Sequence, residues 1–359
     1  MINDIRERKK SKIKLNENEK LESASPRIIK FPKEVQMPYV GLVKSEVGYY
    51  AYWPKFERIL KNSGIPYSFI DIKRSTFIKE VEKFDIIVWR TPSEYSEQWE
   101  AKDKIEFIQN FMGKLTLPNK ESLWFYEDKV RQQWLFDYYN LPSIKTFISH
   151  SREEVNDFIN NTNYPIISKD KTSAGSSGVI SVKNKKIANK IYREVFSNGM
   201  KLFNKYIRQK DYVLFQESVP NNGFDLRIIM VGNSYFGYYR YPKKGDFRAS
   251  GSGILEKKEI PKDVLLLAKR VREYLPKSYL LAVDFLQDKR DQKYYIIETS
   301  IFVSIESSEQ LEVNKVPGRY IEEDGEFTFE AGRFWLQELM IEEIIKEWIE
   351  KSLEGRTNK

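Results

Sequence analysis

Between residues 225 and 300, the chain contains four short apolar runs that have the composition of β-strands. The runs LRIIMV and YFGYYR are joined by a Gly-Asn turn, and LAVDFLQ and KYYIIET are joined by a charged loop. Apolar, β-branched or aromatic runs joined in this way are typical of hairpins. The pattern therefore predicts two antiparallel hairpins that flank a helix, with Asp284 and Glu298 close together on paired strands.

From Met37 onward, candidate strands alternate with a candidate helix. PYVGLVK, YSFIDI and DIIVWR are the strands, and Pro54 opens a helix that ends at Gly64. This alternation predicts a small α/β domain with a parallel sheet. Ligands of such sheets bind at the carboxyl ends of the strands, which singles out Lys44–Glu46 and Arg90–Pro92. Ordinary polar loops would fit these two segments equally well.

The middle of the chain predicts one helix from Asn119 to Tyr139, with Val130, Trp134 and Leu135 as its apolar stripe. Further on, the sequence YPIISKDKTSAGSSGVISV predicts two strands around a loop of small residues. Such a loop lets backbone N–H groups approach anionic oxygens closely. A simple Gly/Ser hairpin turn is the alternative, and the loop lacks the GKS or GKT of a Walker P-loop.

The last two segments are a connection and a helix. Residues 302–330 are rich in Glu and contain a turn, and long connections of this kind often bind substrate. Residues 331–353 place apolar side chains at helical spacing and predict an amphipathic closing helix. The fold class is therefore α/β, with an α+β C-terminal half. The predicted parts are a flexible basic tail (1–36), a substrate domain (37–118), a central lobe (119–216) and a C-terminal lobe (217–359).

The composition of the chain excludes several kinds of site. The chain has 359 residues, 41% of them hydrophobic, which is enough for two or three domains with large cores. It has no cysteine and one histidine, which excludes a disulfide framework, a thiol nucleophile and a histidine-rich metal site. No apolar run is long enough to span a bilayer, and no signal-peptide pattern opens the sequence, so we expect a cytoplasmic protein without a membrane partner.

The formal charge of +8 lies mostly in the tail. Residues 1–33 carry ten Lys or Arg and five Asp or Glu, so +5 of the charge belongs to them and +3 to the other 326 residues. The tail has few apolar residues and no sustained period, which is typical of a flexible segment or of an arm packed on a second copy of the chain. The rest shows no basic stripe, so a nucleic-acid partner is not expected.

The hairpin region also concentrates charged side chains. Arg240 and the loop Gly245–Arg248 accompany Asp284 and Glu298. Carboxylate oxygens suit Mg²⁺, and guanidinium groups suit phosphate oxygens, so these residues indicate a metal–polyphosphate site. A solvated charged face on an ordinary sheet is the alternative, and spacing alone leaves both open.

These residues resemble a known family in their order and spacing. Asp225-x-Arg227, Arg240, the GDFR loop and an Asp on one strand with a Glu fourteen positions later resemble the ATP-binding half of the ATP-grasp ligases. The likeness is greatest to the branch of ribosomal-protein glutamate ligase and glutathione synthetase. It implies an ATP-grasp fold preceded by a pre-ATP-grasp domain. The implied cofactors are ATP and Mg²⁺, as two ions that Mn²⁺ can replace.

The resemblance also implies roles for individual residues. Two lysines match those that reach the nucleotide phosphates, the small-residue loop matches a phosphate-covering loop, and VLFQES matches the linker that faces adenine. Arg240 and Arg248 match the catalytic arginines. The implied nucleotide-binding residues are Lys129, Lys169, Ser176, Ser177, Gly178, Gln216, Glu217, Val219 and Asp225, and the implied metal ligands are Asp284, Glu298 and Ser300.

Two departures from the family pattern bear on the metal site. The family ends its metal motif as Glu-x-Asn, whereas this chain has Glu298-Thr299-Ser300, and Ser250 stands where an Asn often follows the GDFR arginine. A serine oxygen coordinates Mg²⁺ more weakly than an amide oxygen. The sequence Glu312-Val313-Asn314 copies the motif literally but follows a poor strand, so we favour Glu298.

The function implied by the resemblance is an ATP-dependent carboxylate–amine or carboxylate–thiol ligase that works through an acyl phosphate. Its substrates would be a small-molecule or peptide carboxylate and an amine acceptor. Two alternatives remain, which are an ATP-grasp kinase that phosphorylates a small-molecule hydroxyl and a non-catalytic nucleotide-binding protein. The sequence does not identify the substrate.

Overall fold

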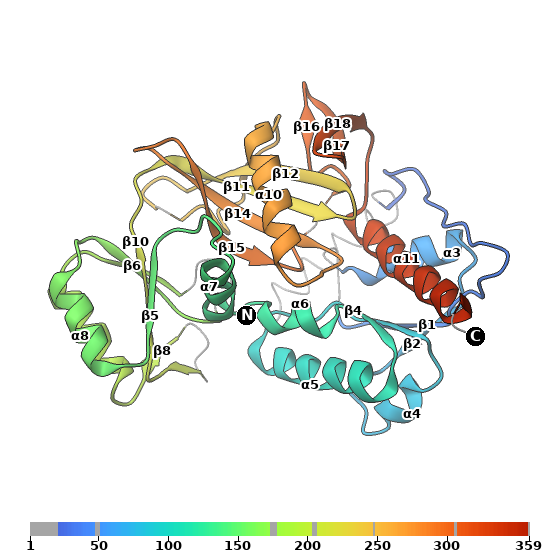
Figure 1. Ribbon diagram of the computed structural model, residues 1–359, viewed down its shortest axis with the longest axis horizontal. Coiled ribbons are helices and arrows are strands. Elements are labelled where there is room, and N and C mark those ends of the chain that lie inside the picture. Colours follow the sequence, from blue (N-terminus) through green and yellow to red (C-terminus); the bar gives the residue numbers. More distant parts are fainter. Residues whose placement is uncertain are drawn as a thin grey trace, which may run out of the picture.

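Each of the three main parts of the chain is built on its own β-sheet (Figure 1). The computed structural model describes residues 21–46, 51–172, 178–202, 207–246, 248–304 and 307–357. The substrate domain, the central lobe and the C-terminal lobe follow one another along the chain. No helix in these described ranges is long and apolar enough to cross a membrane.

The substrate domain contains a parallel sheet in the strand order β2-β1-β3-β4. Its strands are β1 (Val40–Val43), β2 (Tyr67–Ile70), β3 (Ile86–Val88) and β4 (Leu115–Leu117), and its helices are α3 (Trp53–Asn62), α4 (Phe77–Val81) and α5 (Tyr95–Met112). The three predicted strands and the helix with Pro in its first turn are confirmed. Strands β1 and β3 are fully buried because both faces of a parallel sheet are covered.

The predicted helix over 119–139 is wrong, because two helices occupy this segment. They are α6 (Lys120–Phe125) and α7 (Lys129–Tyr138). Each has its own N-cap: Asn119 accepts a hydrogen bond from the backbone N–H of Ser122, and Asp128 accepts one from that of Arg131. Between them Glu127 has φ 51°, a left-handed conformation that no helix continues.

The buried face of α7 also differs from the predicted stripe. Trp134 is 51% exposed, whereas Gln132, Gln133 and Phe136 are buried. Amide side chains are rarely buried without hydrogen bonds. Here both glutamines donate hydrogen bonds to groups outside the helix, so α7 is docked on its neighbours by polar contacts as well as by apolar ones.

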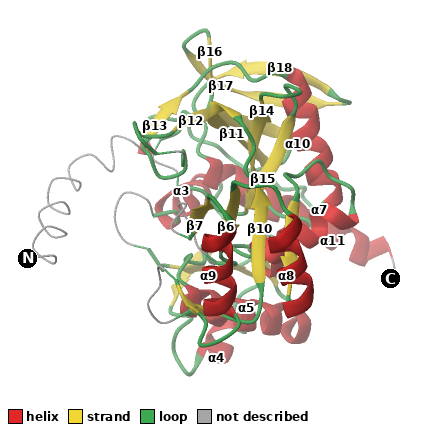
Figure 2. Cartoon of the chain, turned by 90° about the vertical axis from the view of Figure 1, so that its left-hand side faces the viewer, coloured by secondary structure: helices red, strands yellow, loops and turns green. Residues whose placement is uncertain are grey.

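The central lobe contains an antiparallel sheet in the order β5-β10-β6-β7, covered on one face by two helices. Figure 2 shows these helices side by side in front of the sheet. The elements are β5 (Thr146–Ser149), α8 (Arg152–Asn161), β6 (Ile166–Lys169), β7 (Val179–Val182), α9 (Lys185–Val195), β8 (Met200–Lys201), β9 (Arg208–Gln209) and β10 (Val213–Glu217). The lobe has its own hydrophobic core, separate from that of the rest of the protein.

The C-terminal lobe contains an antiparallel sheet in the order β15-β14-β11-β12-β17-β16. Its strands are β11 (Asn221–Val231), β12 (Ser234–Tyr241), β13 (Ile254–Glu256), β14 (Leu281–Asp288), β15 (Tyr294–Ser300), β16 (Glu312–Val313), β17 (Val316–Glu323) and β18 (Glu326–Ala331). The two predicted hairpins, β11–β12 and β14–β15, flank α10 (Lys262–Tyr274) as expected, and Asp284 pairs with Glu298. In the segment 302–330, which was predicted as a long connection, β17 pairs with the edge of β12 and so enlarges the main sheet.

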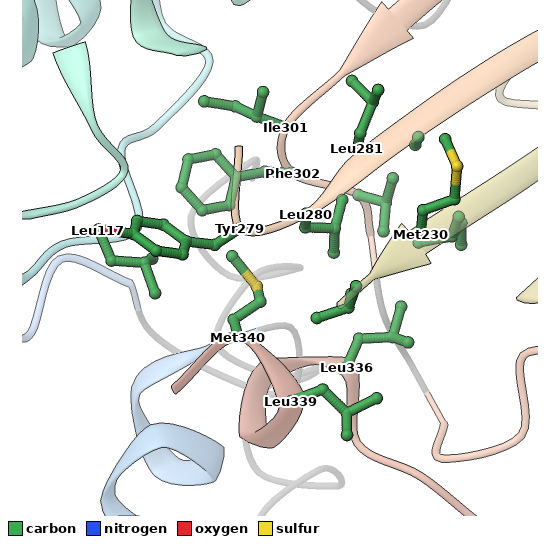
Figure 3. Packing of buried hydrophobic residues seen from close by; sticks show 14 of the residues in the cluster. Leu117, Met230, Tyr279, Leu280, Leu281, Ile301, Phe302, Leu336, Leu339 and Met340 are labelled. Carbon is green, nitrogen blue, oxygen red and sulfur yellow. The ribbon is translucent and has the colours of Figure 1, made fainter. Parts of the chain in front are cut away.

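The closing helix α11 (Leu336–Thr357) connects the C-terminal lobe with the substrate domain. It packs against α3 and carries buried Leu336, Leu339 and Met340. Figure 3 shows these three side chains in one cluster with Leu117 of β4 and Met230 of β11. The substrate domain and the C-terminal lobe therefore share one hydrophobic core.

The expectation of a flexible tail up to residue 36 needs correction for its described part. Residues 21–36 lie against α11, with Arg27 paired to Glu342 through two hydrogen bonds. The indole N–H of Trp348 donates to the backbone carbonyl of Gln36 at 2.9 Å. Ala24 is 3% exposed. Sequence periodicity could not predict these contacts, because they depend on isolated side chains rather than on a periodic apolar face.

Candidate active site

One cavity of about 160 Å³ lies between the central lobe and the C-terminal lobe, and most of the predicted site residues line it. Its walls come from α7, from β6 and β10 of the central lobe and from β11, β12, β14 and β15 of the C-terminal lobe. The predicted residues that line it are Lys129, Lys169, Gln216, Glu217, Val219, Asp225, Arg240, Arg248, Asp284 and Glu298. The structure therefore brings together residues that lie far apart in the sequence, from Lys129 to Glu298.

Two arginines hold the carboxylate of Asp284 on the floor of the cavity. Arg227 donates to both of its oxygens, Nε to Oδ1 at 2.7 Å and Nη2 to Oδ2 at 2.8 Å. Arg240 donates to Oδ2 of Asp284 at 2.7 Å and to Oδ1 of Asp225 at 2.5 Å. The pairing follows from the strand register, which sets Asp225 opposite Arg240 and Arg227 opposite Asp284.

The charges of this network act on the two acids differently. Burial alone would raise the pKa of Asp284, but the guanidinium groups of Arg227 and Arg240 outweigh it and hold that pKa well below its usual range. Burial raises the pKa of Asp225, which pairs with Arg240. Asp284 is therefore the firmly ionised member of the network.

Glu298 lies beside two lysines from different elements. Its carboxylate is 3.3 Å from the ammonium of Lys129, at the start of α7. Burial tends to lower the pKa of Lys129, and the carboxylates of Glu298 and Glu127 more than compensate, so this pKa is raised. Burial lowers the pKa of Lys169 to about 8, with the neighbouring charge of Lys129 acting in the same direction. Two lysines of unequal basicity thus face one carboxylate.

Glu127 adds a carboxylate that the sequence argument did not assign. Burial raises its pKa to about 7, and the like charge of Glu298 adds to the effect, against the opposing charges of Lys129, Arg227 and Arg90. Glu127 precedes by two residues Lys129, which lines the cavity.

The segment Gln216–Val219, which the resemblance implies is the adenine-facing linker, begins in the last two residues of β10 and lines the cavity. Gln216 donates a hydrogen bond to the hydroxyl of Thr146 at 3.0 Å, and the backbone N–H of Glu217 donates to the carbonyl of Lys145 at 2.9 Å. The carboxylate of Glu217 forms an ion pair with Arg290 at 2.7 Å. This acid therefore has a cationic partner that a ligand hydroxyl would have to share.

Arg248 comes to the cavity from the loop between β12 and β13. Within that loop it is paired with Asp246, whose carboxylate lies 2.8 Å from its Nη2. Gly245 precedes the pair with φ 85°, a conformation that favours glycine. The pairing keeps the guanidinium close to the loop at 39% exposure rather than buried on the sheet.

Several expected site residues lie apart from this cavity. The hydroxyl of Ser300 donates to the carbonyl of Phe302 at 2.6 Å. In the described part of the chain neither Ser300 nor Gly178 lines the cavity, and Gly178 instead accepts a hydrogen bond from the backbone of Asp170. Ser176 and Ser177 lie outside the described residues. Asn314 stands in the β16–β17 turn with φ 51°, and Glu312 lies 3.5 Å from Lys257.

The donor set fits a divalent cation bound together with phosphate. Among the described residues, no three His, Cys, Asp or Glu side chains form a complete metal cage. Mg²⁺ does not need one, since it is commonly held by one or two carboxylates plus substrate phosphates and water. Glu298 and Asp284, paired across β14 and β15, are carboxylates of this kind.

Sequence reasoning missed two kinds of residue. The motif Asp225-x-Arg227 includes Arg227, but no function was assigned to it from the sequence. Its position opposite Asp284 on a neighbouring strand indicates that it binds this carboxylate. Gln132 was missed because a glutamine inside a predicted helix carries no signal of its own. It joins α7 to β15 in the structure.

The chain resembles known proteins in sequence and in fold. The family described as the RimK-like ATP-grasp domain matches residues 126–319. No curated protein shows significant sequence similarity to the chain.

Three solved structures illustrate the structural similarity. The RimK-domain ATP-grasp protein of Sphaerobacter thermophilus is 14% identical, with a TM-score of 0.51 over 73% of this chain and 91% of that one. The D-alanine–D-alanine ligase of Bacillus anthracis, solved with ATP, is 13% identical, with a TM-score of 0.52 over 74% and 87%. The N5-carboxyaminoimidazole synthetase of Staphylococcus aureus, solved with ADP, is 8% identical, with a TM-score of 0.53 over 77% and 74%. At these identities the likeness is one of fold.

Proposed function

Because the chain belongs to the RimK-like ATP-grasp family, we propose that it is an ATP-dependent ligase that joins a carboxylate to an amine through an acyl phosphate. One observation carries the proposal, which is that four cationic side chains and the acids Asp284 and Glu298 line a single cavity between two lobes. The cations are Lys129, Lys169, Arg240 and Arg248.

The cavity lining offers apolar side chains for a base and charged side chains for phosphates. Ile144, Ile167 and Leu286 lie near the linker Gln216–Val219, where we place the adenine. Glu217 would accept hydrogen bonds from the ribose. Lys129 and Lys169 would bind the phosphates, with Gly178, Ser176 and Ser177 in the loop that covers them and Asp225 orienting Arg240.

We place the metal among the charged side chains, with Glu298 and Asp284 as ligands and Ser300 where the family has Asn. A bound divalent cation would bridge phosphate oxygens and neutralise charge on them. Mg²⁺ and Mn²⁺ both suit carboxylate ligands. The protein's own contribution is to hold the reacting groups in line and to supply fixed positive charge.

The reaction has two steps in this proposal. A carboxylate oxygen of the first substrate attacks the γ-phosphorus of ATP, the bond to the β–γ bridging oxygen breaks and ADP leaves. The nitrogen of the amine then attacks the acyl carbon, inorganic phosphate leaves and the nitrogen loses a proton. Arg240 and Arg248 would stabilise the charge that spreads over the phosphoryl oxygens in the first step.

The test measures products with candidate substrates. Wild-type protein, ATP and Mg²⁺ are incubated with panels of carboxylates and amines, and ADP, phosphate and coupled product are quantified. ADP with phosphate and an amide product supports the ligase. A phosphorylated hydroxyl compound would favour a kinase instead, and a thioester would identify a thiol acceptor. Absence of nucleotide binding by calorimetry would end the proposal.

A matched pair of variants locates the phosphate site. Lys169→Ala removes a buried cation of the cavity, whereas Lys183→Ala removes an exposed one beyond β7. Loss of a charge-assisted contact worth about 1.5–3 kcal/mol corresponds to a tenfold or larger fall in ATP affinity. The fall is expected for Lys169→Ala alone.

A further inference from the structure

Glu127 stands at an unusual point of the backbone. It lies between the end of α6 and the cap of α7, with φ 51°. A glutamate rarely adopts this left-handed conformation, which Gly, Asn and Asp tolerate better. Such strained residues are concentrated at functional sites, because the strain persists only where the surroundings enforce it.

The carboxylate of Glu127 lacks a full set of partners. In the parts of the chain that the structure describes, its Oε2 is buried and has no hydrogen-bond partner. Its strongest charged neighbour is Glu298, which has the same sign, and the cations Lys129, Arg227 and Arg90 each act on it less strongly. A buried carboxylate in this situation is unfavourable unless a cation joins it.

Two of the three expected metal ligands already form other hydrogen bonds. Arg227 and Arg240 already donate three hydrogen bonds to Asp284, so a metal ion at Asp284 competes with two guanidinium groups. Among the described residues Ser300 does not line the cavity, and its hydroxyl donates a hydrogen bond to the carbonyl of Phe302. Glu298 is the expected ligand that faces the cavity beside a lysine rather than beneath two arginines.

We propose that Glu127 is a metal ligand that acts with Glu298 to hold a divalent cation against the ATP phosphates, in place of the amide oxygen that Ser300 does not supply. This inference rests on the proposed nucleotide-binding function. It adds a residue from the junction of α6 and α7 to a site otherwise built on β14 and β15.

The position of Lys129 agrees with this assignment. Its ammonium lies 3.3 Å from Glu298, and Glu127 is the next strongest carboxylate that acts on it. Without a bound metal ion, Lys129 thus acts on both acids, and Arg227 and Arg90 also act on Glu127. When a divalent cation binds and neutralises the two carboxylates, Lys129 can bind the phosphate oxygens instead.

The test uses Mn²⁺ as the probe, with the full chain and a non-hydrolysable ATP analogue. Free Mn²⁺ is measured by electron paramagnetic resonance during titration of wild type, Glu127→Gln, Glu127→Asp and Glu121→Gln. Glu121 lies on α6 with an exposed side chain and is the matched control. Changes to the surroundings of metal ligands lower metal affinity roughly 10–100-fold, and we expect at least the lower figure for Glu127→Gln.

The outcomes separate this inference from the proposed function. Weaker Mn²⁺ binding by Glu127→Gln, with metal-free nucleotide affinity and melting temperature kept, supports it. Partial restoration by Glu127→Asp, or by adding Ser300→Asn to Glu127→Gln, supports it further. If wild type binds nucleotide with Mn²⁺ and Glu127→Gln binds Mn²⁺ equally well, the inference is wrong and the proposed function stands. If wild type binds no nucleotide, the proposed function fails first.

Discussion

Gln132 on α7 forms two hydrogen bonds with the backbone of Thr299 on β15. Its side-chain nitrogen donates to the Thr299 carbonyl at 2.9 Å, and its side-chain oxygen accepts from the Thr299 N–H at 2.9 Å. Lys129 lies one helical turn before Gln132, and Glu298 precedes Thr299. The amide therefore fixes the helix that carries the lysine relative to the strand that carries the acid.

Replacing Gln132 by Ala should lower both stability and nucleotide affinity. Two buried backbone groups lose their partners, and each such loss costs about 1–3 kcal/mol. Urea unfolding measures the stability, and calorimetry with ATP measures the affinity. Gln133→Ala is the control, because Gln133 contacts the side chains of Asp137 and Ser143 rather than β15. Equal ATP affinities for the two variants would contradict the positioning role.

Nucleotide affinity should depend on pH through Lys169. Burial lowers the pKa of this lysine to about 8, so its positive charge is present below that pH and is lost above it. Phosphate binds the charged form, and affinity should therefore fall as the pH rises through about 8. Lys169→Arg should remove the dependence, because a guanidinium keeps its charge throughout this range. A wild-type affinity that stays constant between pH 7 and 9 would count against Lys169 as a phosphate contact.

Arg58 and Glu338 provide a test of the docked N-terminal segment. Arg58 of α3 lies 2.5 Å from the fully buried Glu338 of α11, and it also donates to the carbonyl of Ala24 at 2.6 Å. Arg58→Met leaves the acid without its cation and should destabilise the protein by roughly 3–5 kcal/mol. The double variant Arg58→Met with Glu338→Leu should recover much of this loss in a thermal-unfolding measurement. A double variant as unstable as Arg58→Met would mean that the ion pair is not the cause.

The same pair predicts a pH dependence of stability. Burial raises the pKa of Glu338 to about 7, against the opposing charge of Arg58. The folded state then holds a proton that the unfolded chain releases at lower pH, so the contribution of Glu338 to stability falls as the pH rises toward 7. Glu338→Gln should flatten this part of the stability profile. An unchanged slope would show that Glu338 ionises in the folded protein as it does in the unfolded chain.

Arg240→Lys should lower the stability of the protein, although the substitution keeps the positive charge. The guanidinium joins Asp225 and Asp284 at once, whereas an ammonium cannot make both contacts in the same fork geometry. One of the two buried carboxylates then loses its hydrogen bond from residue 240, at a cost of about 1–3 kcal/mol, although Asp284 keeps Arg227 in either case. Arg333→Lys, at a half-exposed pair with Glu309, is the control and should leave the denaturation midpoint unchanged. Equal midpoints for both variants would argue against the network.

The two hairpins of the C-terminal lobe were predictable from the sequence, because each is encoded locally by apolar runs and a turn. The pairing of β14 with β15 brings Asp284 close to Glu298 as predicted, whereas their exact register depends on a β-bulge between Asp284 and Phe285 that no local pattern encodes. The break between α6 and α7 was not predicted, since the apolar spacing continues across it and the signal lies in the cap Asp128. The docking of residues 21–36 and the pairing of β17 with β12 depend on partners far away in sequence, which no local pattern encodes.

The two hydrophobic cores have a consequence for synthesis of the chain. The central lobe closes its core with residues 147–215, so it can fold as soon as that stretch has left the ribosome. The substrate domain is made earlier but cannot complete its core, because α3 packs against α11 at the opposite end of the chain. Part of its apolar surface stays uncovered until α11 has been made, so this domain completes its core only after the central lobe has completed its own.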